Sequence, residues 1–330
     1  MARKPKTKTK FNPYQVITDT ILASLEKGVQ PWRKGWTALG GALSRPVSGG
    51  TGKPYSGVNV LLLWAAQSER GYHSDTWHTY KGAQGKSGQV RKGEKGTRIV
   101  KWLFLPFKEN GKVKLDASGE PVTFAKMRLY TVFNACQIEW EEGSKHDPGP
   151  RPTLQEDTVL IDGGKRSEAG DEYEDAKVIL EAWSEQVTIT HGGDSAFYRP
   201  SNDFIQLPHF EQFHGEAEYF STAFHEVIHS TGHSTRLNRF KKERKGSYKQ
   251  AYAFEELVAE LGAAFLCADA GINQPEEPRE DHAQYLNHWL EVLKDDPKAI
   301  VSAASKAEKA AKLVLTTAEH PGIEKQQAAK

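Results

Sequence analysis

Cysteine is scarce in this chain: its 330 residues include only two, Cys136 and Cys267. They lie in separate apolar segments, so the sequence offers no disulfide framework. Long hydrophobic runs are lacking too, because the apolar stretches are strand-sized or broken by polar residues, and this excludes a membrane span. The lysine-rich N-terminus is not followed by the apolar segment of a signal peptide. We therefore expect a soluble cytoplasmic protein with no membrane partner.

Motifs for nucleotide chemistry are also missing. The glycine-rich stretches 40–57 and 82–96 suggest phosphate-binding loops, but neither contains the Gly-x-x-x-x-Gly-Lys-Ser/Thr pattern. Neither stretch follows a clear parallel strand, which argues against a nucleotide hydrolase. The chain shows no acidic catalytic cluster outside the two helices considered below, which argues against a primase.

An excess of one charge is absent overall but present locally. The net charge is +1, yet residues 1–150 hold 24 Lys and Arg against 12 Asp and Glu, and the remainder holds 20 against 31. A basic half joined to an acidic half predicts two domains with different partners. We expect the first domain to bind a polyanion.

The basic half mixes helical and strand patterns, which indicates the α+β class. Apolar spacing predicts helices over 13–27 and 58–66, and strands over 99–107 and 127–140. Prolines, glycines and mixed charge make 143–156 the predicted linker. The predicted division is a basic disordered arm at 1–11, a first domain at 12–142, the linker, a second domain at 157–317 and a flexible tail at 318–330.

The segment His225-Glu226-Val227-Ile228-His229 is the clearest functional signal in the chain. Residues four apart lie on one face of a helix, so His225 and His229 point the same way and can hold one Zn²⁺. Glu226 beside them can accept a proton from a water molecule that the metal activates. Apolar neighbours and a stop at Gly232 predict that this helix is buried.

A catalytic zinc needs a third protein ligand. A histidine six residues after the second is excluded, because Thr235 occupies that position. His233 is separated from the predicted helix by Gly232. The remaining source is a second helix, predicted over 252–266, which is apolar except for its carboxylates.

Glu256 and Glu260 share a face of that second helix. We predict that Glu256 binds the metal and that Glu260 orients a ligand histidine from behind, with Glu255 as the alternative ligand. A solvated face shared with the lysines of 241–249 is the competing interpretation, but it would expose several apolar residues. The expected metal is Zn²⁺, or another divalent ion such as Mn²⁺. Tyr252 or His233 are the nearest candidates for a donor that stabilises an oxyanion.

Aromatic and basic residues are interleaved in the basic half. Single-stranded nucleic acid is bound by cations that follow its phosphates and by rings that stack on its bases. About half of the aromatics would instead be expected in the core. The predicted DNA-binding residues are Trp32, Arg33, Trp36, Lys53, Tyr55, Trp77, Arg91, Lys92, Lys95, Arg98 and Trp102.

Several motifs give the chain a resemblance to ArdC-type antirestriction proteins, which are carried by conjugative plasmids. They are Thr51 to Asn59 and Val90 to Thr97 in the basic half, and Asp203 to Pro208, His225 to Arg239 and Glu255 to Leu261 in the acidic half. The resemblance implies an α+β domain for single-stranded DNA, shared with TraC-type plasmid primases. It also implies that a zincin-like metallopeptidase domain follows.

Such a protein would coat incoming single-stranded DNA non-specifically and help it escape restriction, including after transfer to a recipient cell. The metal site would in addition hydrolyse a protein substrate of the host. The alternative is a single-stranded-DNA shield, or a primase-accessory protein, whose metal site is structural or vestigial. Glu226 favours the peptidase, since a structural site needs no general base. The lack of a recognisable substrate-selecting pocket favours the shield.

Overall fold

The computed structural model describes residues 11–33, 44–150, 173–240, 248–272 and 282–319, with the side chains of 282–285 excepted. The predicted arm at 1–11 and the predicted tail at 318–330 fall almost wholly outside these ranges, as does the second half of the predicted linker. Among the described residues, no helix is both long and apolar enough to cross a bilayer.

The N-terminal half is α+β, as predicted. Its main sheet has the strand order β1-β2-β7-β4, and β3 pairs separately with β8. The elements are α1 (Pro13–Leu25), β1 (Val47–Ser48), α2 (Val58–Arg70), β2 (Thr76–His78), α3 (Tyr80–Gln84), β3 (Gly88–Val90), β4 (Thr97–Pro106), β5 (Lys108–Glu109), β6 (Lys112–Val113), β7 (Thr123–Asn134) and β8 (Ile138–Trp140).

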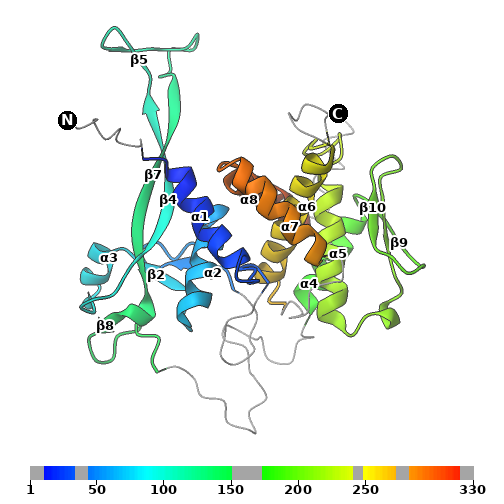
Figure 1. Ribbon diagram of the computed structural model, residues 1–330, viewed down its shortest axis with the longest axis horizontal. Helices are drawn as coiled ribbons and strands as arrows, with labels where there is room; N and C mark the ends of the chain where they lie inside the picture. Colours follow the sequence, from blue (N-terminus) through cyan, green and yellow to red (C-terminus); the bar gives the residue numbers. More distant parts are fainter. Residues whose placement is uncertain (1–10, 34–43, 151–172, 241–247, 273–281, 320–330) are drawn as a thin grey trace, which may run out of the picture.

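The C-terminal half is mainly helical, with a three-stranded sheet of order β10-β11-β9. Its elements are α4 (Glu174–Ser184), β9 (Thr188–His191), β10 (Phe197–Arg199), β11 (Phe204–Leu207), α5 (Glu216–Ser230), α6 (Tyr248–Asp269), α7 (His282–Asp295) and α8 (Ala299–Glu319). Helix α6 packs against α5, α7 and α8 (Figure 1).

Local sequence explains where the first helices begin and end. Asn12 caps α1 by accepting a hydrogen bond from the backbone N–H of Tyr14, and Pro13 occupies the first helical position, where its missing N–H is harmless. Helix α2 ends at Gly71, whose φ of 64° places it in the left-handed region that glycine adopts at little cost.

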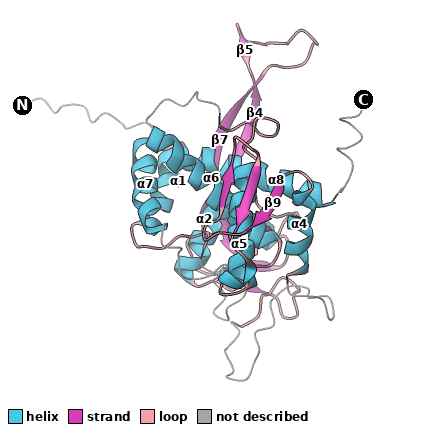
Figure 2. Ribbon diagram, turned by 90° about the vertical axis from the view of Figure 1, so that its right-hand side faces the viewer, coloured by secondary structure: helices cyan, strands magenta, loops and turns pink. Residues whose placement is uncertain are grey.

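Strands β4 and β7 form the longest pairing in the molecule as described. They run antiparallel from Thr97 opposite Val132 to Pro106 opposite Thr123. Figures 1 and 2 show that this two-stranded ribbon extends away from the helices, with the β5–β6 hairpin at its far end. Beyond its base the ribbon is therefore exposed on both faces.

The strand predicted over 127–140 is interrupted at 135–137, so that prediction is wrong for these three residues and confirmed on either side of them. Strand β7 ends at Asn134, whose side chain accepts from the N–H of Cys136, while the Gln137 side chain accepts from the N–H of Asn134. This reciprocal cap closes a short 3₁₀ turn, and the chain then enters β8. The apolar pattern continued across the turn, so spacing alone did not reveal it.

The two halves share one continuous hydrophobic core. Trp32 lies edge-on to Trp289 with 6.0 Å between ring centroids, and Trp64 lies 5.9 Å from Phe265. Both pairs join the N-terminal half to the C-terminal helices.

Polar contacts strengthen the same junction. Arg45 forms ion pairs with Asp269 and Glu308, each at 2.8 Å. The halves are thus packed together rather than joined only by the connecting chain.

Candidate metal centre

The candidate site lies between α5 and α6, at a point where glycine allows the helices to approach closely. A Cβ on Gly262 would lie 2.8 Å from Ile228 Cδ1, closer than side chains normally pack. Because glycine has no Cβ, α6 can lie directly against α5. This contact sets the face of α5 that carries His225 and His229 opposite Glu256 of α6.

Three side chains converge there. The Nε2 atoms of His225 and His229 are 3.2 Å apart, and they lie 3.5 and 3.4 Å from the two carboxylate oxygens of Glu256. Among the described residues, this is the only group of three or more His, Cys, Asp or Glu arranged to hold a metal ion. All three side chains are largely buried.

The donor set fits a zinc-type ion. Two ligand atoms, each about 2.0–2.1 Å from a tetrahedral ion, are separated by about 3.3 Å. The observed separations of 3.2 to 3.5 Å match this value. Two imidazoles and one carboxylate are also a ligand combination of catalytic zinc sites, which keep a fourth position for water.

Each histidine is backed by a second carboxylate. Glu260 Oε2 lies 3.6 Å from His225 Nδ1, and Glu255 Oε1 lies 3.7 Å from His229 Nδ1. Carboxylates in this position orient a metal-binding imidazole and make it more basic. The structure therefore places Glu255 behind His229, and Glu256 is the carboxylate that faces both Nε2 atoms.

Each backing carboxylate is in turn held by an arginine. Arg33 Nε donates to Glu260 Oε1 at 2.7 Å, and Arg239 donates to Glu255 at 2.7 Å. Arg239 also donates to the Ile228 carbonyl at the end of α5. Two parallel chains of contacts result, one from Arg33 to His225 and one from Arg239 to His229.

The arrangement favours positive charge between the helices. Burial lowers the pKa of His229, but hydrogen bonds to Glu255 and Glu256 outweigh burial and raise this pKa to about 10. Burial opposes protonation of His225 in the same way, and Glu256 and Glu260 raise its pKa above the usual value. The two imidazoles hold the pKa of Glu256 well below its usual range, although burial raises it. The carboxylates that raise these pKa values would also favour a metal cation, which binds the neutral imidazoles and therefore competes with the protons.

The other predicted site residues lie around this triad. Glu226 is 6% exposed and acts electrostatically on both histidines. Tyr252 lies one helical turn before Glu256, is 46% exposed and stacks on Tyr248. His233 lies outside the triad, and its Nδ1 atom is 2.8 Å from Thr235 Oγ1 and 3.8 Å from Asp203 Oδ2.

The role of Arg33 was not found from the sequence, which placed it among the DNA-binding residues. The Arg33 side chain is 15% exposed and is paired with Glu260, which lies 227 positions further along the chain. No local pattern links two residues so far apart. Arg239 lies within the motif from His225 to Arg239, but its contact with Glu255 was also not predicted.

Two of the predicted DNA-binding aromatics are core residues, and that prediction is wrong for both. Trp32 is 0% and Trp77 is 1% exposed, so neither ring can stack on a base. Trp32 packs on Trp289, and Trp77 packs on Tyr72. Trp36 lies outside the described residues.

The remaining predicted DNA-binding residues lie nearer the surface. Tyr55 is half-buried, and Trp102 is 40% exposed on the ribbon. Arg91 is paired with Glu94 at 3.0 Å. The exposed cations of this set are Lys53, Arg91, Lys92, Lys95 and Arg98.

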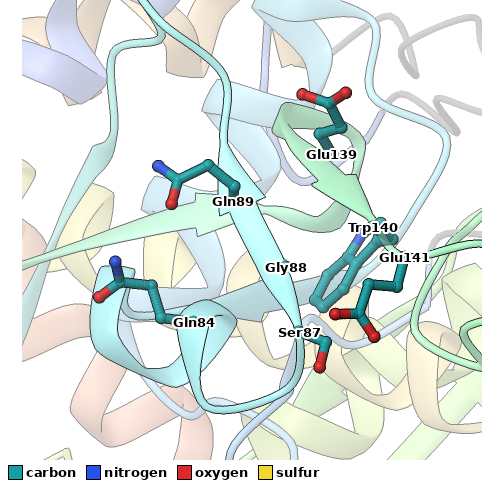
Figure 3. A pocket seen from close by; sticks show the side chains of 7 residues that line it. All are labelled: Gln84, Ser87, Gly88, Gln89, Glu139, Trp140 and Glu141. Atoms are coloured by element: carbon teal, nitrogen blue, oxygen red, sulfur yellow. The ribbon is translucent and has the colours of Figure 1, made fainter.

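A separate pocket lies where β3 pairs with β8 (Figure 3). Its wall includes Trp140, which packs against Gly88 so closely that a Cβ there would lie 2.6 Å from the indole ring. Two carboxylates, Glu139 and Glu141, line it together with Gln84 and Gln89. These acids make the pocket unsuitable for a nucleic-acid phosphate.

Comparison with known proteins identifies both halves. Residues 11–133 match the family model of the N-terminal domain of the anti-restriction factor ArdC. Residues 175–306 match the family model of a zincin-like metallopeptidase. The His225, His229 and Glu256 triad lies inside the second match.

Three curated relatives align over nearly the whole chain. An uncharacterized protein of Sinorhizobium fredii, y4eC, is 37% identical over 315 residues, which are 94% of this chain and 92% of the relative. Two DNA primases TraC from Escherichia coli are each 36% identical over 90% and 92% of this chain. The chain spans only 19% and 27% of the length of these primases.

Two crystal structures of the antirestriction protein ArdC from the R388 plasmid have a similar fold. The metal-free structure has a TM-score of 0.73 at 35% identity, covering 94% of this chain and 98% of that one. The Mn(II)-bound structure has a TM-score of 0.69 at the same identity, covering 93% and 98%. The likeness therefore includes both halves.

Proposed function

Since the chain belongs to the ArdC family of antirestriction proteins, we propose that it binds single-stranded DNA non-specifically and carries a metal-dependent peptidase centre. In this proposal the protein acts in the cytoplasm and protects DNA that enters a recipient cell. Its second partner is a host protein that the peptidase centre cleaves. The observation that carries the enzymatic part is the convergence of His225, His229 and Glu256.

His225, His229 and Glu256 would hold one divalent ion, Zn²⁺ or Mn²⁺. The Mn(II) in the ArdC crystal structure supports the second of these metals. A bound ion of this kind supplies Lewis acidity towards an amide carbonyl and lowers the pKa of water. Glu255 and Glu260 keep the two imidazoles in place, so the Nε2 atoms already face the same point.

Glu226 is the proposed general base. It follows His225 directly on α5, and its carboxylate is buried beside the triad. A carboxylate in this position can take a proton from the attacking water and pass it to the leaving amine. Tyr252 is the proposed donor to the oxyanion, because it lies on the same face of α6 as Glu256 and remains accessible.

The DNA-binding part is supported by the basic character of the N-terminal half and by its family. The excess of cations over acids in residues 1–150 suits a polyanion. The exposed cations Lys53, Arg91, Lys92, Lys95 and Arg98 and the half-exposed Trp102 are the proposed contacts from the predicted set. Non-specific contact with phosphates needs no base-reading residue.

Metal content and DNA binding should be measured together on wild type and on His225→Ala. We expect about one divalent ion in the wild type and none in the variant, because two ligands are too few for a stable site. Binding of single-stranded DNA should persist in both proteins. If the wild-type protein takes up no divalent ion, the proposed peptidase activity is contradicted. The alternative, a DNA-binding shield without peptidase activity, would then be favoured. Loss of DNA binding in the variant would contradict the proposal that the metal and the DNA bind at separate sites.

A further inference from the structure

The outer part of the β4–β7 ribbon carries an unusual set of side chains on one face. Directly opposed residues of antiparallel strands share a face, and Lys101 lies opposite Arg128. Alternate positions along each strand join them. We call this surface the ribbon face, and its members are Lys101, Leu103 and Leu105 of β4 and Phe124, Lys126, Arg128 and Tyr130 of β7.

The ribbon face is open to solvent. Phe124 is 46% and Tyr130 is 41% exposed, and the three cations Lys101, Lys126 and Arg128 are exposed. The two aromatic residues lie at opposite ends of the face, six residues apart on β7, which corresponds to about 20 Å. At these exposed fractions both rings are accessible for stacking on a base.

The charges of the ribbon face are uncompensated. Like charges directly opposite on paired strands destabilise a sheet, and Lys101 and Arg128 are such a pair, with Lys126 as their neighbour. Neither 97–106 nor 123–134 contains an acidic residue. Within the described ranges, none of these three cations forms an ion pair with a carboxylate; Lys101 instead lies 5.5 Å from the centroid of the Tyr130 ring. An anion bound along the face would remove this repulsion.

The opposite face of the ribbon is partly occupied by the protein itself. Val100 and Met127 are buried in the main core, and the ring centroid of Trp102 lies 6.4 Å from that of Tyr14 of α1. Among the described residues, nothing covers the ribbon face in this way beyond its base, where Ile99 and Val132 are buried. The opposite face also exposes two rings, Trp102 at 40% and Phe104 at 71%, but Arg98 is the only cation among its paired residues. The ribbon face is therefore the one on which cations and rings alternate.

A second copy of the chain would be a poor occupant of this surface. An identical ribbon would bring its own unpaired Lys101, Lys126 and Arg128 and would increase the repulsion. A polyanion with flat, stackable groups complements both kinds of side chain. Single-stranded nucleic acid has this chemistry, whereas a duplex hides its bases.

We infer that the ribbon face is a binding track for single-stranded nucleic acid. Phosphates lie against Lys101, Lys126 and Arg128, and unpaired bases stack on Tyr130 and Phe124. The inference rests on the proposed DNA-binding function and adds a contact surface to the exposed cations already proposed. These rings take the place of Trp32 and Trp77, which are buried.

The test compares two triple variants of the full chain. The first is Lys101→Gln, Lys126→Gln and Arg128→Gln. The matched control is Lys249→Gln, Lys309→Gln and Lys312→Gln, which removes the same charge from exposed positions of α6 and α8. Each is titrated with a fluorescently labelled oligothymidylate at several salt concentrations. A third variant, Tyr130→Ala with Phe124→Ala, tests stacking.

Loss of three phosphate contacts should lower the magnitude of the slope of log affinity against log salt by about two, while the control keeps the wild-type slope. The stacking variant should bind at least about five-fold more weakly at every salt concentration. Lys101→Arg with Lys126→Arg should bind as the wild type does, which shows that charge and not loss of folding is responsible.

Two outcomes would overturn the inference in distinguishable ways. If wild type binds the oligonucleotide but the first triple variant has the wild-type affinity and slope, the ribbon face is not the track. The proposed function would then survive with another surface. If wild type itself does not bind, the DNA-binding function fails and the inference fails with it. Equal losses in the first variant and the control would also refute the inference, because net charge alone would explain them.

Discussion

Charged side chains are arranged in opposite ways in the metal centre and on the ribbon face. In the metal centre every carboxylate behind a histidine is paired with an arginine, and the whole network is buried between helices. On the ribbon face three cations lie together on exposed strands without any acid. The metal centre therefore contains its own counter-charges, whereas the cations of the ribbon face have no carboxylate partner among the described residues.

The difference explains what each region can bind. A buried charge is tolerated only when it is paired and hydrogen-bonded, so the triad is held in a fixed geometry before any ligand arrives. Exposed and unpaired cations impose no such geometry and suit a flexible polyanion of any sequence. This difference supports the proposal that the centre binds one small cation and that the ribbon face binds an extended polyanion.

The largest expected effect concerns Glu226 in the metal centre. Glu226→Gln keeps the size of the side chain but cannot accept a proton, so peptide hydrolysis should fall by about 10²- to 10⁴-fold. Metal content should stay that of the wild type, because Glu226 is not one of the three converging donors. A peptide-library digest with parallel metal analysis measures both. Metal-dependent cleavage retained by the variant would refute the assignment of the base.

The next effect separates core aromatics from those of the ribbon. Trp32→Ala should lower the free energy of unfolding by about 3–5 kcal/mol, because it removes a fully buried ring at the junction of the two halves. Tyr130→Ala should change it by only about 1 kcal/mol, since Tyr130 is 41% exposed. Urea denaturation gives both values. Similar losses for the two variants would show that the ribbon ring is structural.

A smaller effect compares the two arginines of the metal centre. Arg33→Gln and Arg239→Gln should each weaken metal binding by about 10- to 100-fold, because each removes the arginine that holds the carboxylate behind one histidine. Arg33→Lys should recover part of the loss by keeping the charge. Competition with a chromophoric chelator measures the affinities.

The comparison of these variants also tests the junction. Arg33 belongs to the N-terminal half, so a loss in Arg33→Gln would mean that this half helps to form the metal centre. Unchanged affinity in Arg33→Gln, with a loss only in Arg239→Gln, would confine the centre to the C-terminal half.

The sequence predicted features that depend on neighbouring residues, and it did not predict contacts between distant ones. The α+β character of the N-terminal half and the helices around the metal motif followed from local periodicity. The spacing of His225 and His229 on one helix placed them on one face, and the structure brings Glu256 to them. The face of a helix depends only on residues nearby in the sequence, and this is why these features could be predicted from the sequence.

Contacts between distant parts of the chain could not be predicted from the sequence. Basic neighbours in the sequence predict that Trp32 and Trp77 bind DNA, yet the core that buries them is assembled from residues far along the chain. The pairing of Arg33 with Glu260 could not be predicted for the same reason, since Glu260 lies on α6. The ribbon face appears only when the register of β4 on β7 is known, because that register sets Lys101 opposite Arg128.

The most direct measurement is a pair of titrations of the wild-type chain, one with Zn²⁺ and one with single-stranded DNA, each at about 50 and about 200 mM of a non-coordinating salt. Three phosphate contacts predict a fall in DNA affinity of at least about 20-fold over this range. The buried and paired metal centre should change its affinity by less than about three-fold. A DNA affinity that does not depend on salt, or a metal affinity that falls as steeply, would contradict the division of charge proposed for these two regions.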